Sequence, residues 1–293
     1  MSEPVIFYNR AKKCEQTELI LGDRMLRLAY STPARHVLSW PLFGTALFSR
    51  LLGWYANRGL SKGRISRTIK ELQMDMTDYE IPEGGFRCFN EFFARKLKPG
   101  ARPFAPEGLC SPADCRLLVF PKLEDGICIP VKGAQFTVAE LLNDEQTAQL
   151  FKGGTLCVFR LCPSDYHRYH FPDDGQLIKS WRLPGKYHSV NPIALEQRIK
   201  VFTTNVRVVS LLELAHFGHA AYIEVGAFGV ASITQSFKGS DFKRGNEKGY
   251  FTFGGSTIIM LFEQGKVTLD DDILERSAKG IECLVKAGEH IGH

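Results

Sequence analysis

The strongest constraint on the fold of this sequence lies in its second part, where short β-prone runs follow one another with almost no helical signal between them. The runs are rich in Val, Ile, Leu and Phe, are separated by Gly, Pro or Asp, and occupy residues 116–120, 127–131, 155–161, 206–212, 221–225 and 230–237. One helix interrupts them, opened by a capping box of Thr137 and Glu140. Because consecutive parallel strands need a helical crossover, the series predicts a mainly antiparallel, β-rich domain over residues 101–293.

Helical signals concentrate in residues 1–100. Apolar residues recur there at helical spacing, and residues that commonly cap helices precede the apolar runs. The expected helices cover residues 18–30 and 41–57, a third that Ser61 caps and that runs through Leu72, and a short one that Asn90 caps and Pro99 follows. The predicted fold class is therefore α+β, with a helical N-terminal region followed by the β-rich domain.

The basic residues of the chain are concentrated in this helical region. The 293 residues carry a net charge of +5, and 44% of them are hydrophobic, which excludes a disordered tail or a small disulfide scaffold. Nine Lys and Arg residues lie between Arg24 and Lys70, whereas no Asp or Glu lies there. Phe43, Leu47 and Trp54 fall on one helical face of the same span. The charge excess is therefore a local feature of one aromatic, basic segment.

This basic segment fits two structures equally well. Basic residues next to Trp and Phe on an amphipathic helix are typical of a protein that binds the membrane interface. A helix that packs on the protein's own core and keeps a solvated basic rim gives the same pattern. Nucleic acid is a third kind of partner, but no nucleic-acid-binding motif accompanies the charge.

The N-terminus and the cysteines indicate the compartment. No basic start followed by an apolar core of a secretory signal is present, and Pro41 and Arg50 interrupt the most apolar early stretch, residues 37–55. We therefore expect a protein that stays on the side of the membrane on which it is made. The eight cysteines form no CxxC pair, which favours reduced thiols over a zinc ribbon or a disulfide framework.

Two short segments carry acid–base residues. Residues 165–170 read DYHRYH, so that His167 and His170 lie beside an Asp and two Tyr residues. The histidines suit general acid–base catalysis because imidazole titrates near neutral pH, although the segment alone fits a polar loop with histidines bonded to backbone more simply. A zinc site would need a third ligand that the neighbourhood does not provide. In residues 110–115, Asp114 suits the orientation of a histidine or a local turn.

A Gly-Gly-Ser-Thr turn interrupts an apolar run near the C-terminus, over residues 251–260. It lacks the GxSxG arrangement of a nucleophile elbow, and hairpin turns often contain Gly-Gly and Ser. The glycine at position 255 leaves the carbonyl group before Ser256 sterically open and permits backbone angles that bring the Ser256 hydroxyl towards it. A backbone N→O acyl shift requires that geometry.

Together these segments resemble the phosphatidylserine decarboxylase proenzyme family over most of the chain, with a length similar to its shorter bacterial branch. The segments that carry the resemblance are 89–97 (FNEFFARKL), 111–114 (SPAD), 165–170 (DYHRYH), 189–192 (SVNP), 245–251 (GNEKGYF) and 255–257 (GST). Two positions depart from the family's usual residues. Cys115 replaces a Gly after the motif Asp, and Asn246 replaces an Asp.

The resemblance implies that the chain cleaves itself. In this family pattern Asp114 orients His170, and His170 acts as general base on Ser256. The Ser256 hydroxyl attacks the Gly255 carbonyl carbon and forms an ester, and β-elimination and hydrolysis then convert Ser256 into a pyruvoyl group. The implied products are a large chain, 1–255, and a small chain that begins at residue 256.

The resemblance also implies the cofactor, the substrate and the partners. The pyruvoyl group derived from Ser256 is the covalent cofactor, which forms an imine with phosphatidylserine so that CO₂ leaves and phosphatidylethanolamine results. His167 is implied to assist the protonation of the substrate carbon. The small chain, 256–293, stays bound to the large chain without a covalent bond. The expected protein is a peripheral protein of the cytoplasmic face of the cell membrane that contacts anionic lipid, allows a homodimer and involves neither metal nor nucleic acid.

Two other functions remain to be distinguished from this one. A Ser-His-Asp acyl hydrolase would use the same Ser256 on an intact chain, and a fluorophosphonate label on that serine would identify it. A non-catalytic lipid-binding module would use only the basic helices, so Ser256→Ala would change nothing.

Overall fold

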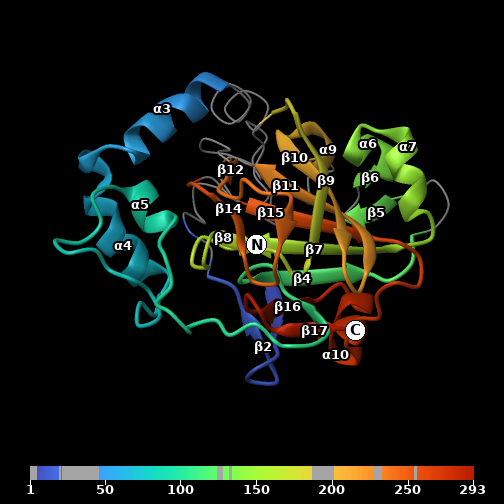
Figure 1. Cartoon of the computed structure of the whole chain (residues 1–293). Coiled ribbons are helices and arrows are strands. Elements are labelled where there is room, and N and C mark those ends of the chain that lie inside the picture. Colours follow the sequence, from blue (N-terminus) through green and yellow to red (C-terminus); the bar gives the residue numbers. More distant parts are fainter. Residues whose placement is uncertain are drawn as a thin grey trace, which may run out of the picture.

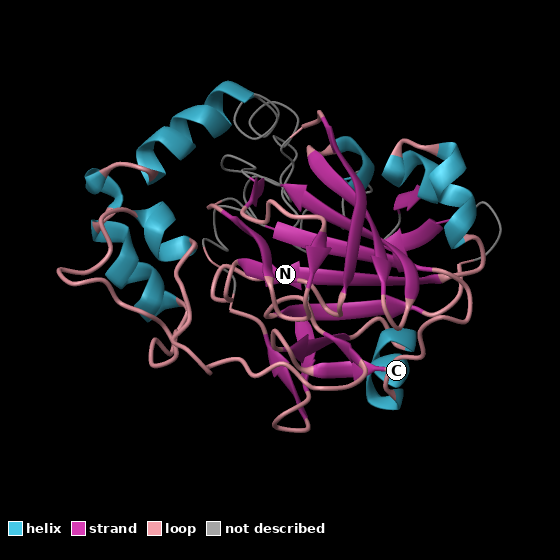
Figure 2. Cartoon of the chain, viewed as in Figure 1, coloured by secondary structure: helices cyan, strands magenta, loops and turns pink. Residues whose placement is uncertain are grey.

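The computed structural model describes residues 5–19, 21, 46–123, 128–131, 134–186, 201–226, 233–253 and 256–293. Strands dominate the chain, and short helices lie around the sheets (Figure 2). In Figure 1, α3 (Ala46–Ala56), α4 (Gly63–Glu71) and α5 (Phe89–Phe93) lie together on one side of the sheets, whereas α6 (Val138–Leu142) and α7 (Glu145–Ala148) lie on the other. The protein is thus an α+β fold with mostly β-structure, as the sequence predicts.

The main sheet has ten strands. In sheet order they are β13 (Asp241–Phe242), β9 (Gly175–Leu183), β10 (Arg207–Leu214), β11 (Gly218–Gly226), β15 (Ser256–Phe262), β7 (Thr155–Leu161), β4 (Cys115–Phe120), β16 (Glu282–Val285), β1 (Ile6–Asn9) and β2 (Cys14–Thr17). Neighbouring strands are antiparallel except β1 and β16, which run parallel. The prediction of a mainly antiparallel sheet is therefore confirmed.

Smaller elements complete the fold. A second sheet has the order β12 (Ile233–Gln235), β14 (Glu247–Phe251) and β8 (Arg168–His170), and two pairs of strands join β3 (Leu109–Cys110) to β17 (His290–Gly292) and β5 (Cys128–Val131) to β6 (Ala134–Phe136). The other helices of the described residues are η1 (Gly59–Ser61), η2 (Gln149–Phe151), α9 (Val201–Thr204) and α10 (Asp271–Ala278). No helix in the described ranges is long and apolar enough to cross a membrane.

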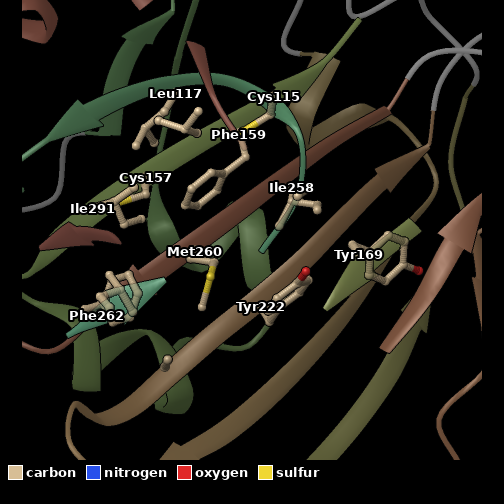
Figure 3. Close-up of a cluster of buried hydrophobic side chains, with 14 of the residues drawn as sticks. Cys115, Leu117, Cys157, Phe159, Tyr169, Tyr222, Ile258, Met260, Phe262 and Ile291 are labelled. Atoms are coloured by element: carbon tan, nitrogen blue, oxygen red, sulfur yellow. The ribbon is translucent and has the colours of Figure 1, made fainter. Parts of the chain in front are cut away.

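The core lies on both faces of the main sheet at β15. All seven residues of this strand are buried. Because side chains alternate along a strand, Ile258, Met260 and Phe262 join one apolar cluster, which Figure 3 shows, and Ile259 and Leu261 join a second cluster on the opposite face. A strand covered on both faces is a water-excluded place for the residue with which it begins.

Several local predictions are confirmed. The strand predicted over residues 155–161 coincides with β7, and the strand predicted over 116–120 lies within β4. The oxygen Oγ1 of Thr137 accepts a hydrogen bond from the amide of Glu140 at 3.0 Å, and Oε2 of Glu140 accepts one from the amide of Thr137 at 2.8 Å, so the capping box is present. The seven cysteines whose side chains the structure describes are free thiols.

The prediction that residues 1–100 are helical is wrong at the beginning of the chain. Residues 6–9 and 14–17 form β1 and β2, which extend the main sheet. The partner of β1 is β16, near the C-terminus, and a pairing so distant along the chain leaves no local sequence signal. The helix predicted over 18–30 falls mostly outside the described residues, whereas α3 accounts for residues 46–56 of the helix predicted over 41–57. The domain boundary at residue 100 stays a prediction.

Two predicted helix caps are wrong. The Ser61 hydroxyl donates to the carbonyl oxygens of Arg58 (2.6 Å) and Ala56 (3.1 Å) and accepts from the amide of Phe89 (2.9 Å), so it does not cap α4. Asn90 lies inside α5, whose N-cap position is Cys88. In both cases a polar residue before an apolar run has partners from other elements of the fold.

Candidate active site

Ser256 is the first residue of β15 and lies between two neighbouring strands. It is paired with Leu161 at the end of β7 and with Gly226 at the end of β11. Its hydroxyl oxygen is buried and has no hydrogen-bond partner among the described residues. A buried hydroxyl without a partner costs about 1–3 kcal/mol, so a serine at this position lowers the stability of the fold. The neighbouring Gly255 lies outside the described residues.

His167 follows β7 by a short loop. Its buried ring has Nδ1 at 2.9 Å from the carbonyl oxygen of Asp165, so Nδ1 carries the hydrogen and donates it. The other ring nitrogen, Nε2, then carries a lone pair and has no partner in the described part of the chain. The ring of Phe93 lies over the imidazole with 3.8 Å between the ring centroids. His167 therefore offers one free proton-accepting atom in an apolar setting.

The charge state of His167 follows from its surroundings. Burial lowers the pKa of His167 to about 3, and the positive charge of Arg95 acts in the same direction. The buried guanidinium of Arg95 donates from Nη2 to the carbonyl oxygens of Ser164 and Asp165, at 2.7 Å each. Arg95 and His167 thus share the Asp165 carbonyl, and the imidazole is neutral at ordinary pH.

His170 lies in β8 and has both ring nitrogens engaged. Nδ1 is 3.0 Å from the carbonyl oxygen of Gly245 and donates to it, and Nε2 is 3.3 Å from the hydroxyl of Tyr166, from which it accepts. Burial lowers the pKa of His170, although the contact with Gly245 and the charges of Glu247 and Asp114 oppose the shift. This histidine is also neutral at ordinary pH.

Asp114 is fully buried in the turn before β4, where cations and a backbone amide surround its carboxylate. Arg102 donates from Nε at 3.0 Å and from Nη2 at 2.9 Å, Nζ of Lys286 is at 3.1 Å, and the amide of Ala287 is at 2.9 Å. Burial alone would raise the pKa of Asp114, but Lys286 and Arg102 hold it below the usual value. The carboxylate is therefore a fixed negative charge beside the two histidines.

The structure brings Asp114, His167 and His170 into one neighbourhood without a direct chain of hydrogen bonds. The amide of His170 donates to the carbonyl oxygen of Pro112 at 2.9 Å, which holds β8 beside the turn of Asp114. The charge of Asp114 acts on both imidazoles and opposes the lowering of their pKa values by burial. Among the described residues, His170 makes no hydrogen bond with Asp114 or Ser256. The catalytic roles of these side chains stay predictions.

Sequence reasoning misses the residues that surround the predicted ones. Arg95 and Tyr166 lie inside the segments 89–97 and 165–170, so their neighbours in the sequence are a usable signal. Lys286 lies 172 residues after its partner Asp114, and no local pattern announces such a contact. No three His, Cys, Asp or Glu side chains converge as metal ligands within the described ranges. A prosthetic group formed from the chain itself fits at Ser256, whose hydroxyl, like that of its neighbour Thr257, is buried and has no hydrogen-bond partner among the described residues.

Comparison with known proteins identifies the family. The family model for phosphatidylserine decarboxylase matches residues 89–293. The phosphatidylserine decarboxylase proenzyme of Clostridium botulinum (strain Langeland / NCTC 10281 / Type F) is 41% identical over 98% of this chain and 98% of its own length. The proenzymes of Clostridium novyi (strain NT), at 40% over 97% and 98%, and Desulfitobacterium hafniense (strain Y51), at 39% over 98% and 97%, are similar throughout. With a match over most of its length, the chain belongs to the phosphatidylserine decarboxylase family.

Proposed function

We propose that this chain is a proenzyme that cleaves itself between Gly255 and Ser256 and then decarboxylates phosphatidylserine. The observation that carries the proposal is the buried, unpartnered hydroxyl of Ser256 at the start of β15, in a chain about 40% identical to proenzymes of that name. Most buried side-chain hydroxyls have a hydrogen-bond partner. Thr257 also lacks one, so the position of Ser256 as the first residue of β15 distinguishes it from that neighbour. A serine that is consumed in a reaction needs none.

Self-cleavage exchanges one bond for another in balanced steps. The Ser256 hydroxyl attacks the carbonyl carbon of Gly255, its proton passes to a neutral histidine, and the C–N bond breaks as an ester forms. Loss of the α-proton of residue 256 then breaks the ester C–O bond and leaves a carboxylate on Gly255. The dehydroalanine that results takes up one water molecule and releases ammonia, so that residue 256 becomes a pyruvoyl group.

The two histidines have different proposed roles. His170 is the proposed base for cleavage, with the Asp114 charge favouring its protonated form. To accept the proton of Ser256, its Nε2 must exchange the hydroxyl of Tyr166 for that of Ser256. His167 is proposed to assist the protonation of the substrate carbon after CO₂ leaves, because its Nε2 has no hydrogen-bond partner among the described residues and can hold a proton there.

The proposed cofactor fits the surroundings of residue 256. The pyruvoyl carbonyl group supplies an electron sink for the loss of CO₂ from a substrate that carries an amine and a carboxylate. The ring of Phe93 packs between His167 and Phe253, at centroid distances of 3.8 Å and 5.5 Å, and gives this part of the site an apolar wall. Since residues 256–262 pair with β11 on one side and β7 on the other, the small chain would stay in the sheet after cleavage.

We also propose that the chain binds the cytoplasmic face of the membrane through α3 and η1. Leu51 and Trp54 of α3 are 57% and 56% exposed, and Leu60 of η1 is 78% exposed. The guanidinium of Arg58 lies 5.1 Å from the centroid of the Trp54 ring. Exposed apolar side chains argue against packing of this helix face on the protein's own core, and each basic residue near an anionic leaflet contributes about 1 kcal/mol.

Intact mass and denaturing electrophoresis test the proposed function. The purified chain is expected to give a 38-residue fragment, residues 256–293, that carries a pyruvoyl group at its N-terminus, and to convert phosphatidylserine in vesicles to phosphatidylethanolamine. Ser256→Ala is expected to abolish both. An active, uncleaved chain of 32.9 kDa would refute the proposal, and a fluorophosphonate label on intact Ser256 would assign the acyl hydrolase function instead.

A further inference from the structure

The side chain of Asn90 joins two segments that are far apart in the sequence. Asn90 is only 5% exposed, and its Oδ1 accepts a hydrogen bond from the amide of Phe253 at 2.9 Å. Its Nδ2 donates to Oδ1 of Asn57 at 2.9 Å, so both ends of the amide are used. The backbone N–H of Phe253 can only donate, which fixes the orientation of the Asn90 amide.

Aromatic packing holds the same segment from the side. The ring of Phe253 makes edge contacts with Phe89 and Phe93 of α5, at centroid distances of 4.9 Å and 5.5 Å. Phe93 in turn lies over the ring of His167. The amide of Phe251 donates to the carbonyl oxygen of His167 at 2.9 Å. Helix α5 and His167 therefore fix the backbone just before the proposed cleavage site.

The proposed reaction needs this backbone to be fixed. On one side of the cleaved bond, the strand pairing of β15 holds Ser256 between β7 and β11. On the other side, β14 ends at Phe251, so strand pairing no longer holds residue 253. The hydroxyl and the carbonyl carbon that react must be held close together, and a displacement of about 1 Å is enough to cost on the order of 100-fold in rate.

We propose that Asn90 is a positioning residue for self-cleavage, which fixes the backbone before Gly255 by accepting the hydrogen bond of Phe253. The inference rests on the proposed function. It also separates the two reactions of the chain, because Phe253 belongs to the large chain and residue 256 to the small chain after cleavage. Asn90 therefore matters for cleavage and not for the turnover of chains already cleaved.

The test compares Asn90→Ala with Asn57→Ala during cell-free synthesis of the full chain. Asn57 is exposed, and its replacement removes the second hydrogen bond of Asn90 while the acceptor for Phe253 remains. We expect Asn90→Ala to slow the appearance of the 38-residue fragment at least tenfold and Asn57→Ala to stay within twofold of the unaltered chain. Cleaved Asn90→Ala chains are expected to keep the turnover per pyruvoyl group within twofold.

Each other outcome overturns the inference. Cleavage of Asn90→Ala at the unaltered rate would remove the role, and equal slowing in both variants would assign the effect to Asn57. Folding is compared by thermal melting on the Ser256→Ala background, where all chains stay uncleaved, and Asn90→Leu replaces Asn90→Ala if the smaller side chain unfolds the protein. If the unaltered chain never yields the fragment, the proposed function is refuted. If the unaltered chain and the Asn90→Ala variant both cleave normally, only this inference is refuted.

Discussion

Strand β15 and helix α3 differ in the exposure of their apolar side chains. All seven residues of β15 are buried, and its side chains alternate between two clusters on the faces of the main sheet. In α3, Leu51 and Trp54 are more than half exposed and lie in the most basic part of the sequence. The difference separates a strand that is buried on both faces from a helix that leaves apolar side chains exposed, and it supports the proposals that chemistry takes place at β15 and that α3 contacts a membrane.

The largest expected effect concerns the candidate active site at β15. His170→Ala is expected to slow self-cleavage by about 10²–10⁴-fold, because a positioned base contributes a factor of that size. The rate is measured from the appearance of the 38-residue fragment after synthesis. His216, whose side chain is 67% exposed, provides the control: His216→Ala should cleave at the unaltered rate.

The result also decides between His167 and His170. If His170→Ala cleaves normally and His167→Ala does not, the free Nε2 of His167 is the base, and the proposed roles are reversed. Normal cleavage in both variants would mean that neither ring accepts the Ser256 proton.

The second prediction contrasts the two regions directly through stability. Met260→Ala in β15 is expected to lower the free energy of unfolding by about 2–5 kcal/mol, because it leaves a cavity in a fully buried cluster. Leu51→Ala in α3 is expected to change it by less than about 0.5 kcal/mol, because the side chain is already 57% exposed. Both are measured by urea unfolding on the Ser256→Ala background. Similar losses would show that an unseen contact covers Leu51.

The same contrast accounts for how much of the fold the sequence predicts. The strand predicted over residues 155–161 is correct because a strand buried on both faces is apolar along its whole length, and this leaves a clear run in the sequence. Strand β9 escapes prediction because four polar residues, Gln176, Lys179, Ser180 and Arg182, are spread along it, so its pairing with β10 leaves no apolar run. Pairing of β1 with β16 and the parallel direction of that pair depend on the whole fold.

The candidate site likewise contains residues that the sequence predicts and residues that it does not. Ser256, His167 and His170 stand out because each lies in a short segment of unusual chemistry, and the family resemblance puts those segments in order. The partners of Asp114 cannot be found in that way, because Arg102 lies 12 residues before it and Lys286 lies 172 residues after it, and neither spacing is a local pattern. The sequence suggests that Asn90 caps a helix, which is wrong. Its hydrogen bond with Phe253 joins residues 163 positions apart, and such a bond leaves no local pattern.

A third prediction concerns the dependence of stability on pH. The pKa of His167 in the folded chain is about 3, below the ordinary value of about 6.5, so the unfolded chain binds one more proton between these values. The contribution to the free energy of unfolding is therefore complete above pH 6.5 and falls as the pH decreases towards 3, by up to about 1.4 kcal/mol per pH unit.

Comparison of variants isolates this effect from the carboxylates that titrate in the same range. On the Ser256→Ala background, His167→Gln should unfold with a shallower pH dependence between pH 6 and 4.5, by about one proton, whereas His293→Gln at the exposed C-terminus should match the parent. An unchanged slope in His167→Gln would mean that the ring is already hydrated in the folded protein. A hydrated His167 ring would mean that water reaches the candidate site, so exclusion of water would no longer distinguish that site from the exposed helix α3.

The smallest expected effect tests the exposed end of the comparison. Leu51→Asp combined with Trp54→Asp is expected to weaken binding to phosphatidylglycerol vesicles about tenfold, since it replaces exposed apolar surface with charges that the anionic lipid repels. Ile178 in β9 is 48% exposed but lies outside the basic segment, so Ile178→Asp is the matched control and should bind within twofold of the unaltered chain. Co-sedimentation with vesicles measures both. Equal weakening in both variants would show that α3 is one exposed apolar surface among several. The exposure of its apolar side chains would then give it no special part in membrane binding.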